Sequence, residues 1–215
     1  MNTPDLATRQ HDALSLLRRA RIMPVLSLAS VEQGLACARA LAAGGLTAIE
    51  VTLRTPAALE AIRAIRDAGL ALTVGAGTVL DAAQLDAAIA HGAEFIVTPG
   101  TPPALADALQ RAPLPVIPGA ASASEIMALH ARGFRTLKFF PAAAIGGVAA
   151  LKALHGPFAE LSFCPTGGIG EHDAGDYLAL PNVPCVGGSW MVKKQWLDAG
   201  DWAAVSASAQ RSLGG

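Results

Sequence analysis

The chain has 215 residues, of which 52% are hydrophobic and 15% are charged, and its formal net charge is −1. This length and apolar content suit one domain with a large core, so we expect residues 1–215 to form a single domain. The balanced charge lacks both the basic excess of a nucleic-acid-binding surface and the acidic excess of a disordered tail, so the expected partner is a small molecule.

Strand-like and helical segments alternate along the chain. Eight strand-like runs are expected at residues 22–28, 46–53, 72–75, 94–98, 115–118, 136–140, 161–164 and 184–186. Helical spacing of apolar residues is found at 32–43, 56–68, 82–91, 102–110, 123–131 and 148–154, and also in two flanking segments, 6–20 and 202–213. Such alternation indicates βαβ units and a parallel sheet.

Eight units in a chain of this length predict an α/β fold, a single (β/α)8 TIM barrel with an extra N-terminal helix and a C-terminal helix. The alternative is an open doubly wound sheet, which is disfavoured because residues 26–31 lack the glycine fingerprint expected after its first strand. Glycines that end helices in the left-handed conformation are expected at five positions: Gly44, Gly69, Gly92, Gly133 and Gly156.

The second strand-like run places a carboxylate and a guanidinium on one strand face. Because side chains alternate between faces, Glu50, Thr52 and Arg54 share a face that points into the predicted barrel. A glutamate there is costly unless it is paired or used in proton transfer. Arginine suits a substrate carboxylate, because its guanidinium donates two parallel hydrogen bonds. An internal Glu50–Arg54 ion pair without a substrate role is the alternative.

The sixth strand-like run contains a lysine among apolar side chains. Lys138 lies between Leu137 and Phe139 and projects, by the same alternation, into the interior that Glu50 faces. Removing an ammonium from water is costly, and a desolvated lysine amine is a nucleophile that forms Schiff bases with carbonyl substrates. Glu50 would then serve as the base. The alternative is an ordinary lysine whose head group reaches water.

Glycine-containing turns follow the late strands. Residues 166–168 read Thr-Gly-Gly after the seventh strand, and residues 187–189 read Gly-Gly-Ser after the eighth. Barrels of this kind bind phosphate at these loops, where backbone N–H groups converge on the anion. The sequence therefore predicts a phosphate site, with a short helix beginning near Ser189. Simple turns are the alternative, as they are for residues 75–78 and 98–100.

No metal site and no cofactor are predicted. The five histidines are not at ligand spacings from one another, and the three cysteines, Cys37, Cys164 and Cys185, fit no paired metal spacing. Free thiols favour a reducing, cytoplasmic setting. Residues 1–20 do not resemble a signal peptide, and the apolar stretch 137–154 is interrupted by lysine, proline and glycine. We therefore expect a cytoplasmic protein without a membrane partner.

Five sequence blocks together resemble the 2-keto-3-deoxy-6-phosphogluconate (KDPG) aldolase family, class I aldolases that include members acting on 4-hydroxy-2-oxoglutarate (KHG). The resemblance spans nearly the whole chain and rests on residues 50–54, 74–80, 138–141, 164–169 and 187–190. The chain departs from the family pattern at Ala143, where many relatives carry glutamate, and at 120–122, where its residues are smaller.

The resemblance implies specific roles for the residues described above. Lys138 would be the Schiff-base lysine and Glu50 the proton-transfer residue. Arg54, Thr78 and Thr166 would hold the carboxylate end of the pyruvyl group, with Pro99 and Phe140 shaping the pocket. The phosphate would be bound by Gly167, Gly168, Gly187, Gly188 and Ser189. The implied reaction is cofactor-free cleavage of KDPG to pyruvate and D-glyceraldehyde 3-phosphate, and the implied assembly is a homotrimer.

Three other functions would also fit parts of this pattern. An aldolase for the galactonate-derived epimer would share the chemistry, although Thr166 followed by two glycines favours the gluconate type. A phosphate-binding barrel isomerase or synthase would use Lys138 as an electrostatic group. A catalytically silent binding module would leave Lys138 and Glu50 as buried charges without a task. Trapping of pyruvate on Lys138 by borohydride separates the aldolases from the other two classes.

Overall fold

The structure, a computed structural model, describes residues 4–214. Its strands are β1 (Ile22–Leu26), β2 (Ala48–Thr52), β3 (Thr73–Gly77), β4 (Phe95–Val97), β5 (Val116–Ile117), β6 (Gly119–Ala120), β7 (Thr136–Phe139), β8 (Ser162–Pro165) and β9 (Val186–Gly188). Its α-helices are α1 (Leu6–Ala20), α2 (Val31–Ala43), α3 (Ala58–Asp67), α4 (Ala82–Ala90), α5 (Pro103–Arg111), α6 (Ala123–Ala131), α7 (Gly147–His155), α8 (Ala174–Leu178), α9 (Lys194–Ala199) and α10 (Trp202–Leu213). Two 3₁₀ turns are η1 (Ala143–Ile145) and η2 (Trp190–Val192).

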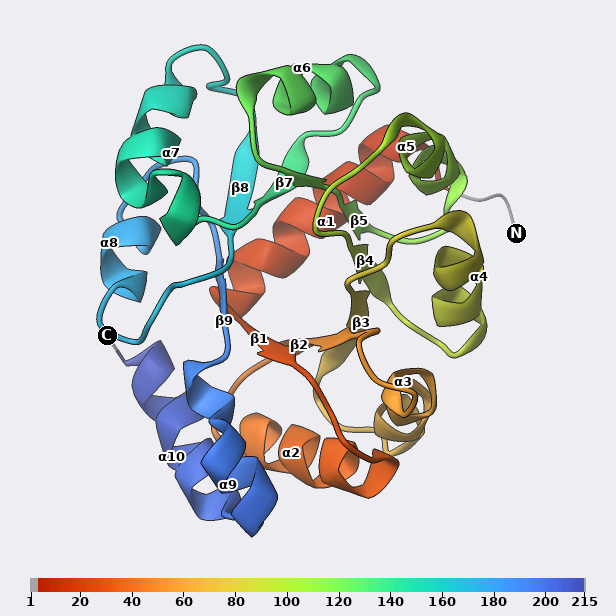
Figure 1. Ribbon diagram of the computed structural model, residues 1–215, viewed down its shortest axis with the longest axis vertical. Coiled ribbons are helices and arrows are strands. Elements are labelled where there is room, and N and C mark those ends of the chain that lie inside the picture. Colours follow the sequence, from red (N-terminus) through yellow and green to blue (C-terminus); the bar gives the residue numbers. More distant parts are fainter. Residues whose placement is uncertain (1–3, 215) are drawn as a thin grey trace.

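The strands are parallel and curl around a central space, with most of the helices outside them (Figure 1). Six strands pair in the order β5-β4-β3-β2-β1-β9, and three pair in the order β6-β7-β8. An isolated parallel bridge between Thr166 and Gly187 joins the ends of β8 and β9. The predicted α/β fold with parallel strands is confirmed.

The fifth predicted strand is divided at a proline. β5 pairs with β4 and β6 pairs with β7, and Pro118 lies between them. Proline has no N–H to donate, so it interrupts the ladder, although its carbonyl oxygen still accepts from the Lys138 N–H at 2.9 Å.

Two apolar clusters hold the fold together. The larger one lies between the strands and the outer helices and includes Ile49, Val51 and Val74. The smaller one lies inside the ring of strands, where Leu17 of α1 packs with Phe95 and other inward-facing residues. The helix α1 crosses behind the strands in Figure 1 and so covers their N-terminal ends. The interior is therefore approached from the C-terminal ends of the strands.

Buried polar side chains anchor α1 to the strands. The Gln10 amide donates to the Val116 carbonyl at 2.9 Å, and its oxygen accepts from the N–H groups of Arg135 and Thr136 at 2.8 and 2.9 Å. Arg9, which is 4% exposed, donates to three carbonyl oxygens at the C-terminal end of α5, those of Leu109, Gln110 and Ala112. These bonds satisfy backbone groups that would otherwise be buried without partners.

The glycine prediction is correct at three helix ends and wrong at two. Gly69, Gly92 and Gly133 have positive φ angles of 62°, 85° and 94°. Gly44 has φ −78° because the turn to the next strand is made one residue later, and Gly156 has φ −57° because the chain continues in a helical conformation.

Among residues 4–214, no helix has both the length and the hydropathy needed to cross a membrane.

Candidate active site

A lysine and a glutamate pair inside the ring of strands. Lys138 on β7 and Glu50 on β2 are 4% and 2% exposed, and the lysine Nζ lies 3.1 Å from the glutamate Oε1. The structure thus brings together the two side chains that strand alternation predicted to meet. The alternative Glu50–Arg54 ion pair does not form, because β2 ends at Thr52 and Arg54 is exposed beyond it.

Small residues on neighbouring strands make room for the Glu50 carboxylate. Glu50 is in register with Gly75 of β3, and a Cβ atom added to Gly77 at the end of that strand would collide with the carboxylate. Thr52, the next residue on the same face, donates its hydroxyl hydrogen to the Leu26 carbonyl at 2.7 Å and so ties β2 to β1. The carboxylate is therefore held in one place by the shape of its surroundings.

Two thiols lie near this pair, Cys164 on β8 and Cys185 directly before β9. Cys164 is in register with Lys138, and Cys185 packs in the same inner cluster. Burial raises the pKa of the Cys185 thiol, and both Cys164 and the negative charge of Glu50 add to the increase. Cys185 is therefore protonated at neutral pH and is not a nucleophile.

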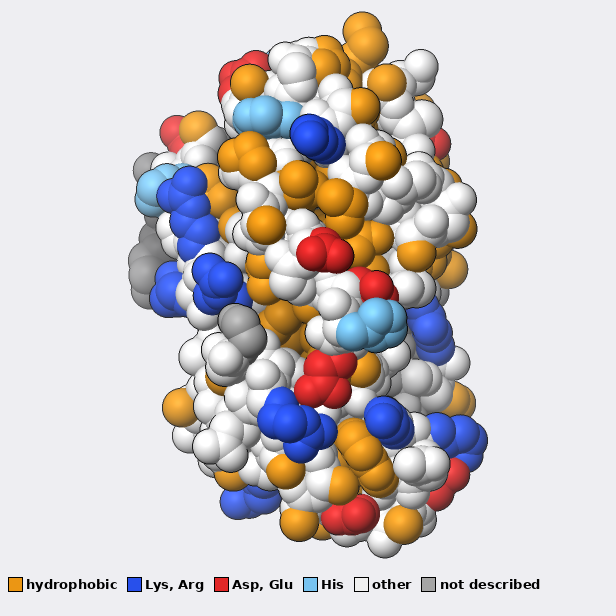
Figure 2. Space-filling model, turned by 90° about the vertical axis from the view of Figure 1, so that its left-hand side faces the viewer, with side chains coloured by type: hydrophobic (Ala, Val, Ile, Leu, Met, Phe, Trp, Pro, Cys, Tyr) orange, Lys and Arg blue, Asp and Glu red, His pale blue; other side chains and the backbone are white. Residues whose placement is uncertain are grey.

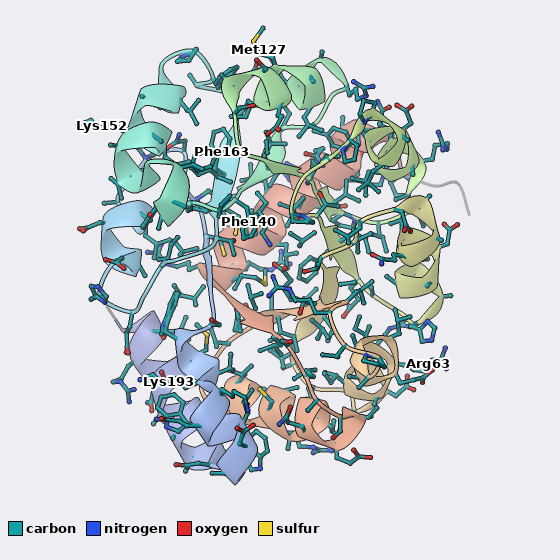
Figure 3. The ribbon with its side chains drawn as sticks, viewed as in Figure 1. Arg63, Met127, Phe140, Lys152, Phe163 and Lys193 are labelled. Atoms are coloured by element: carbon teal, nitrogen blue, oxygen red, sulfur yellow. The ribbon has the colours of Figure 1, made fainter. Side chains whose placement is uncertain are left out.

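The side chains predicted to hold the carboxylate or to shape the pocket lie at the C-terminal ends of the strands. Phe140 follows β7 and lies near the centre of the ring (Figure 3), with its ring centroid 5.4 Å from the Lys138 Nζ. Thr166 is buried at the end of β8, and Pro99 is half-buried after β4. Thr78 is half-buried after β3 and has φ 57°, a left-handed conformation that is rare for a β-branched residue.

The two predicted phosphate loops lie side by side. The Thr166–Gly187 bridge joins them. Gly167 and Gly168 have φ angles of 100° and 75°, which favour glycine. Gly187 and Gly188 are required for close packing instead, because a Cβ atom at these positions would collide with the Thr166 hydroxyl and the Trp190 indole. The predicted short helix near Ser189 is the 3₁₀ turn η2, which begins at Trp190.

A cavity of about 670 Å³ opens beside these loops at the ends of β1, β2 and β9. Its wall contains Arg54 and Ser189, which the sequence motifs had indicated, and also Gln33, Lys193 and Lys194, which they had not. A lysine or glutamine at the start of a helical segment carries no sequence signal of its own. Only the positions of η2, α9 and the start of α2 over the strand ends reveal that these side chains face the cavity.

The described residues provide no group of three or more histidine, cysteine, aspartate or glutamate side chains that could hold a metal ion.

On the face in Figure 2, lysine and arginine side chains intermingle with aspartate and glutamate. No broad surface of one charge covers this face, in keeping with the small net charge of the chain.

Comparison with known proteins gives a consistent result. The family model KDPG and KHG aldolase matches residues 14–208. The 2-dehydro-3-deoxy-phosphogluconate aldolase of Pseudomonas aeruginosa is 49% identical over 93% of this chain and 90% of its own. The KHG/KDPG aldolase of Escherichia coli K12 is 43% identical over 94% and 95%. The crystal structure of KDPG aldolase from Legionella pneumophila, with pyruvate captured as a covalent carbinolamine, has a TM-score of 0.90 at 40% identity, covering 92% of this chain and 96% of that one.

Together with the buried lysine and carboxylate, these similarities make the chain an enzyme of the lyase class that acts on carbon–carbon bonds. The chain belongs to the KDPG and KHG aldolase family.

Proposed function

We propose that the chain is a class I aldolase that cleaves KDPG to pyruvate and D-glyceraldehyde 3-phosphate through a Schiff base on Lys138, and that it also accepts KHG. The contact between Lys138 and Glu50, 3.1 Å apart and almost fully buried, is the observation that carries this proposal. The relatives from P. aeruginosa and E. coli are a KDPG aldolase and a KHG/KDPG aldolase, which supports the choice of substrates.

Glu50 is placed to take and return the protons that imine chemistry requires. It accepts the proton that the Lys138 ammonium must lose, and the free amine attacks the C2 ketone. Proton transfer to the carbinolamine hydroxyl releases water and leaves an iminium ion. Glu50, through a water molecule, then removes the C4 hydroxyl proton, and the C3–C4 bonding electrons move into the iminium. Glyceraldehyde 3-phosphate leaves, and protonation and hydrolysis of the enamine release pyruvate.

The remaining side chains of the site orient the substrate. Arg54, Thr78 and Thr166 bind the carboxylate of the pyruvyl group at the strand ends. Phe140, whose ring lies near the lysine amine, and Pro99 after β4 shape the pocket around the reacting carbon atoms. A carboxylate fixed at one end places C2 against Lys138, and this orientation lowers the barrier to attack.

The phosphate binds where β8 and β9 end. The proposed ligands are the backbone N–H groups of Gly167, Gly168, Gly187 and Gly188 and the hydroxyl of Ser189. The Thr166–Gly187 bridge supports this assignment because it brings the two loops together, and Ser189 faces the adjoining cavity. Glycines in these loops let backbone N–H groups approach an anion closely.

The proposal extends to the architecture and setting of the protein. The proposed architecture is one closed (β/α)8 barrel in a single domain. Two features support it: β5 and β6 lie on either side of Pro118 as parts of one strand, and the Thr166–Gly187 bridge links β8 to β9. The family resemblance supports a homotrimer, and the three free thiols support a cytoplasmic location.

Steady-state cleavage of three substrates tests the proposed function. Pyruvate release from KDPG, from its galactonate-derived epimer and from KHG is measured with the purified protein. We expect the highest kcat/KM with KDPG and a measurable value with KHG. A higher kcat/KM with the galactonate-derived epimer would show that the chain is an aldolase for that epimer. No pyruvate release from any of the three substrates would refute an aldolase function.

A further inference from the structure

The proposed phosphate site lacks a charge to balance its ligand. A phosphate monoester carries nearly two negative charges at neutral pH. The loops around Gly167 and Gly187 provide neutral N–H groups and the Ser189 hydroxyl. A cation within reach would therefore add attraction that the loops cannot supply.

Three cationic side chains line the cavity beside Ser189, and their partners differ. Lys194 is engaged by Asp198, four residues later on α9. Arg54 extends from the end of β2, where the proposed carboxylate site lies. Lys193 makes no ion pair with any of residues 4–214, and its ammonium lies 4.7 Å from the centroid of the Trp196 ring.

The backbone of Lys193 is held firmly at the edge of the cavity. Its carbonyl oxygen accepts from the N–H groups of Trp196 and Leu197 at 2.9 and 3.2 Å, which fixes the start of α9. The Leu197 carbonyl in turn accepts from the Gln33 side chain at 3.4 Å, so α9 is tied to the beginning of α2. Lys193 lies beside α9, far from the α7 residue Lys152 (Figure 3).

We propose that Lys193, supported by the Trp196 ring, binds the phosphate group of the substrate. This contact makes the enzyme prefer phosphorylated 2-keto acids over those that lack the phosphate. Lys193 touches the anionic end of the substrate and takes no part in bond breaking. The cation–π contact keeps the flexible lysine chain near the cavity while the ammonium stays available to an anion. This inference rests on the proposed function.

The test compares KDPG with the same 2-keto acid lacking the phosphate. Lys193→Gln should raise KM for KDPG about fivefold, as expected for one partly exposed charge pair, with little change in kcat. It should leave kcat/KM for the unphosphorylated compound unchanged. Lys193→Arg should retain most of the preference, and Lys152→Gln, which removes the same charge from an exposed site on α7, should behave like the wild type.

Two outcomes separate this inference from the proposed function. If the wild type cleaves KDPG and Lys193→Gln lowers kcat/KM for both compounds equally, or for neither, the role of Lys193 is refuted and the aldolase function stands. If the wild type does not cleave KDPG, the proposed function itself fails. Trp196→Leu should cause a smaller loss of the same preference, with Trp196→Phe closer to the wild type, because a phenyl ring keeps part of the cation–π attraction.

Discussion

At the scale of single residues, the site depends on two opposite charges that are buried together. Taking either Lys138 or Glu50 out of water alone would be expensive, and their contact offsets part of that cost. A structural ion pair would need no opening to solvent. Here the pair lies beneath the C-terminal ends of the strands, close to a cavity and to loops suited to an anion, so the arrangement fits a reaction with a carbonyl compound.

Glu50→Gln tests proton transfer by the carboxylate. The amide has nearly the same shape but cannot take a proton, so kcat for KDPG cleavage should fall by roughly 10²- to 10⁴-fold, the usual contribution of general acid–base catalysis. Circular dichroism should show an unchanged fold. A kcat within a few-fold of the wild type would show that another group moves the protons.

Sequence reasoning found the central pair because the alternation of strand side chains gives the face of each residue. It could not decide between Lys138 and Arg54 as the partner of Glu50, since that choice depends on where β2 ends. The left-handed φ of Thr78 and the position of Lys193 over the cavity were also beyond prediction, because both arise from how distant segments pack.

At the scale of elements, the close approach of β3 to β2 determines where the carboxylate lies. A methyl group at Gly77 would occupy the space of the Glu50 side chain. Gly77→Ala should therefore lower kcat roughly 100-fold by displacing the base. Gly175→Ala is the matched control, because nothing lies within 4 Å of a Cβ atom there and the residue is exposed in α8. Equal activity of the two variants would contradict this account of Gly77.

The attachment of α1 gives a prediction about stability. Gln10→Leu leaves the Val116 carbonyl and the N–H groups of Arg135 and Thr136 without their buried partner. The free energy of unfolding should fall by about 2–4 kcal/mol in urea titrations, since unsatisfied buried polar groups are costly. His11→Ala, at the adjacent exposed position, should change it little. An unchanged urea midpoint for Gln10→Leu would show that α1 is held by apolar packing alone.

Most elements could be predicted, because each strand is a short apolar run and each long helix has apolar residues at regular helical spacing. The division of the fifth strand at Pro118 follows from the missing N–H of proline. That the Pro118 carbonyl accepts a hydrogen bond from Lys138 could not be predicted, because it depends on where β7 lies. The helices α8 and α9 have only 5 and 6 residues, too few to show a periodicity. The conformations of Gly44 and Gly156 depend on the direction of the next segment.

At the scale of the whole molecule, the alternation of strands and helices predicted the parallel order of the strands, while the division into sheets of six and three strands depends on pairings between distant segments. Free thiols are buried both inside the ring of strands and between the strands and the outer helices, and their burial makes the free energy of unfolding depend on pH. Burial raises the pKa of the Cys37 thiol from 9.0 to about 12, and burial also raises the pKa of Cys185. The native state therefore favours the protonated thiols.

The resulting stability is complete below the unfolded pKa of about 9 and is lost as the pH rises toward 12. For Cys37 the loss amounts to about 4 kcal/mol over this range. Urea titrations between pH 8 and pH 11 should show a falling free energy of unfolding, with a shallower fall for Cys37→Ala. A variant with the same slope as the wild type would show that Cys37 does not contribute.

The most direct test of the central claim is trapping of pyruvate on the enzyme. The protein is treated with pyruvate and borohydride, and the modified residue is located by mass spectrometry of peptides. We predict a reduced pyruvyl group on Lys138 in the wild type and none in Lys138→Met, with Lys193→Gln labelled as the wild type is. An unlabelled wild type, under conditions that label a known class I aldolase, or a label on another lysine, would contradict the account.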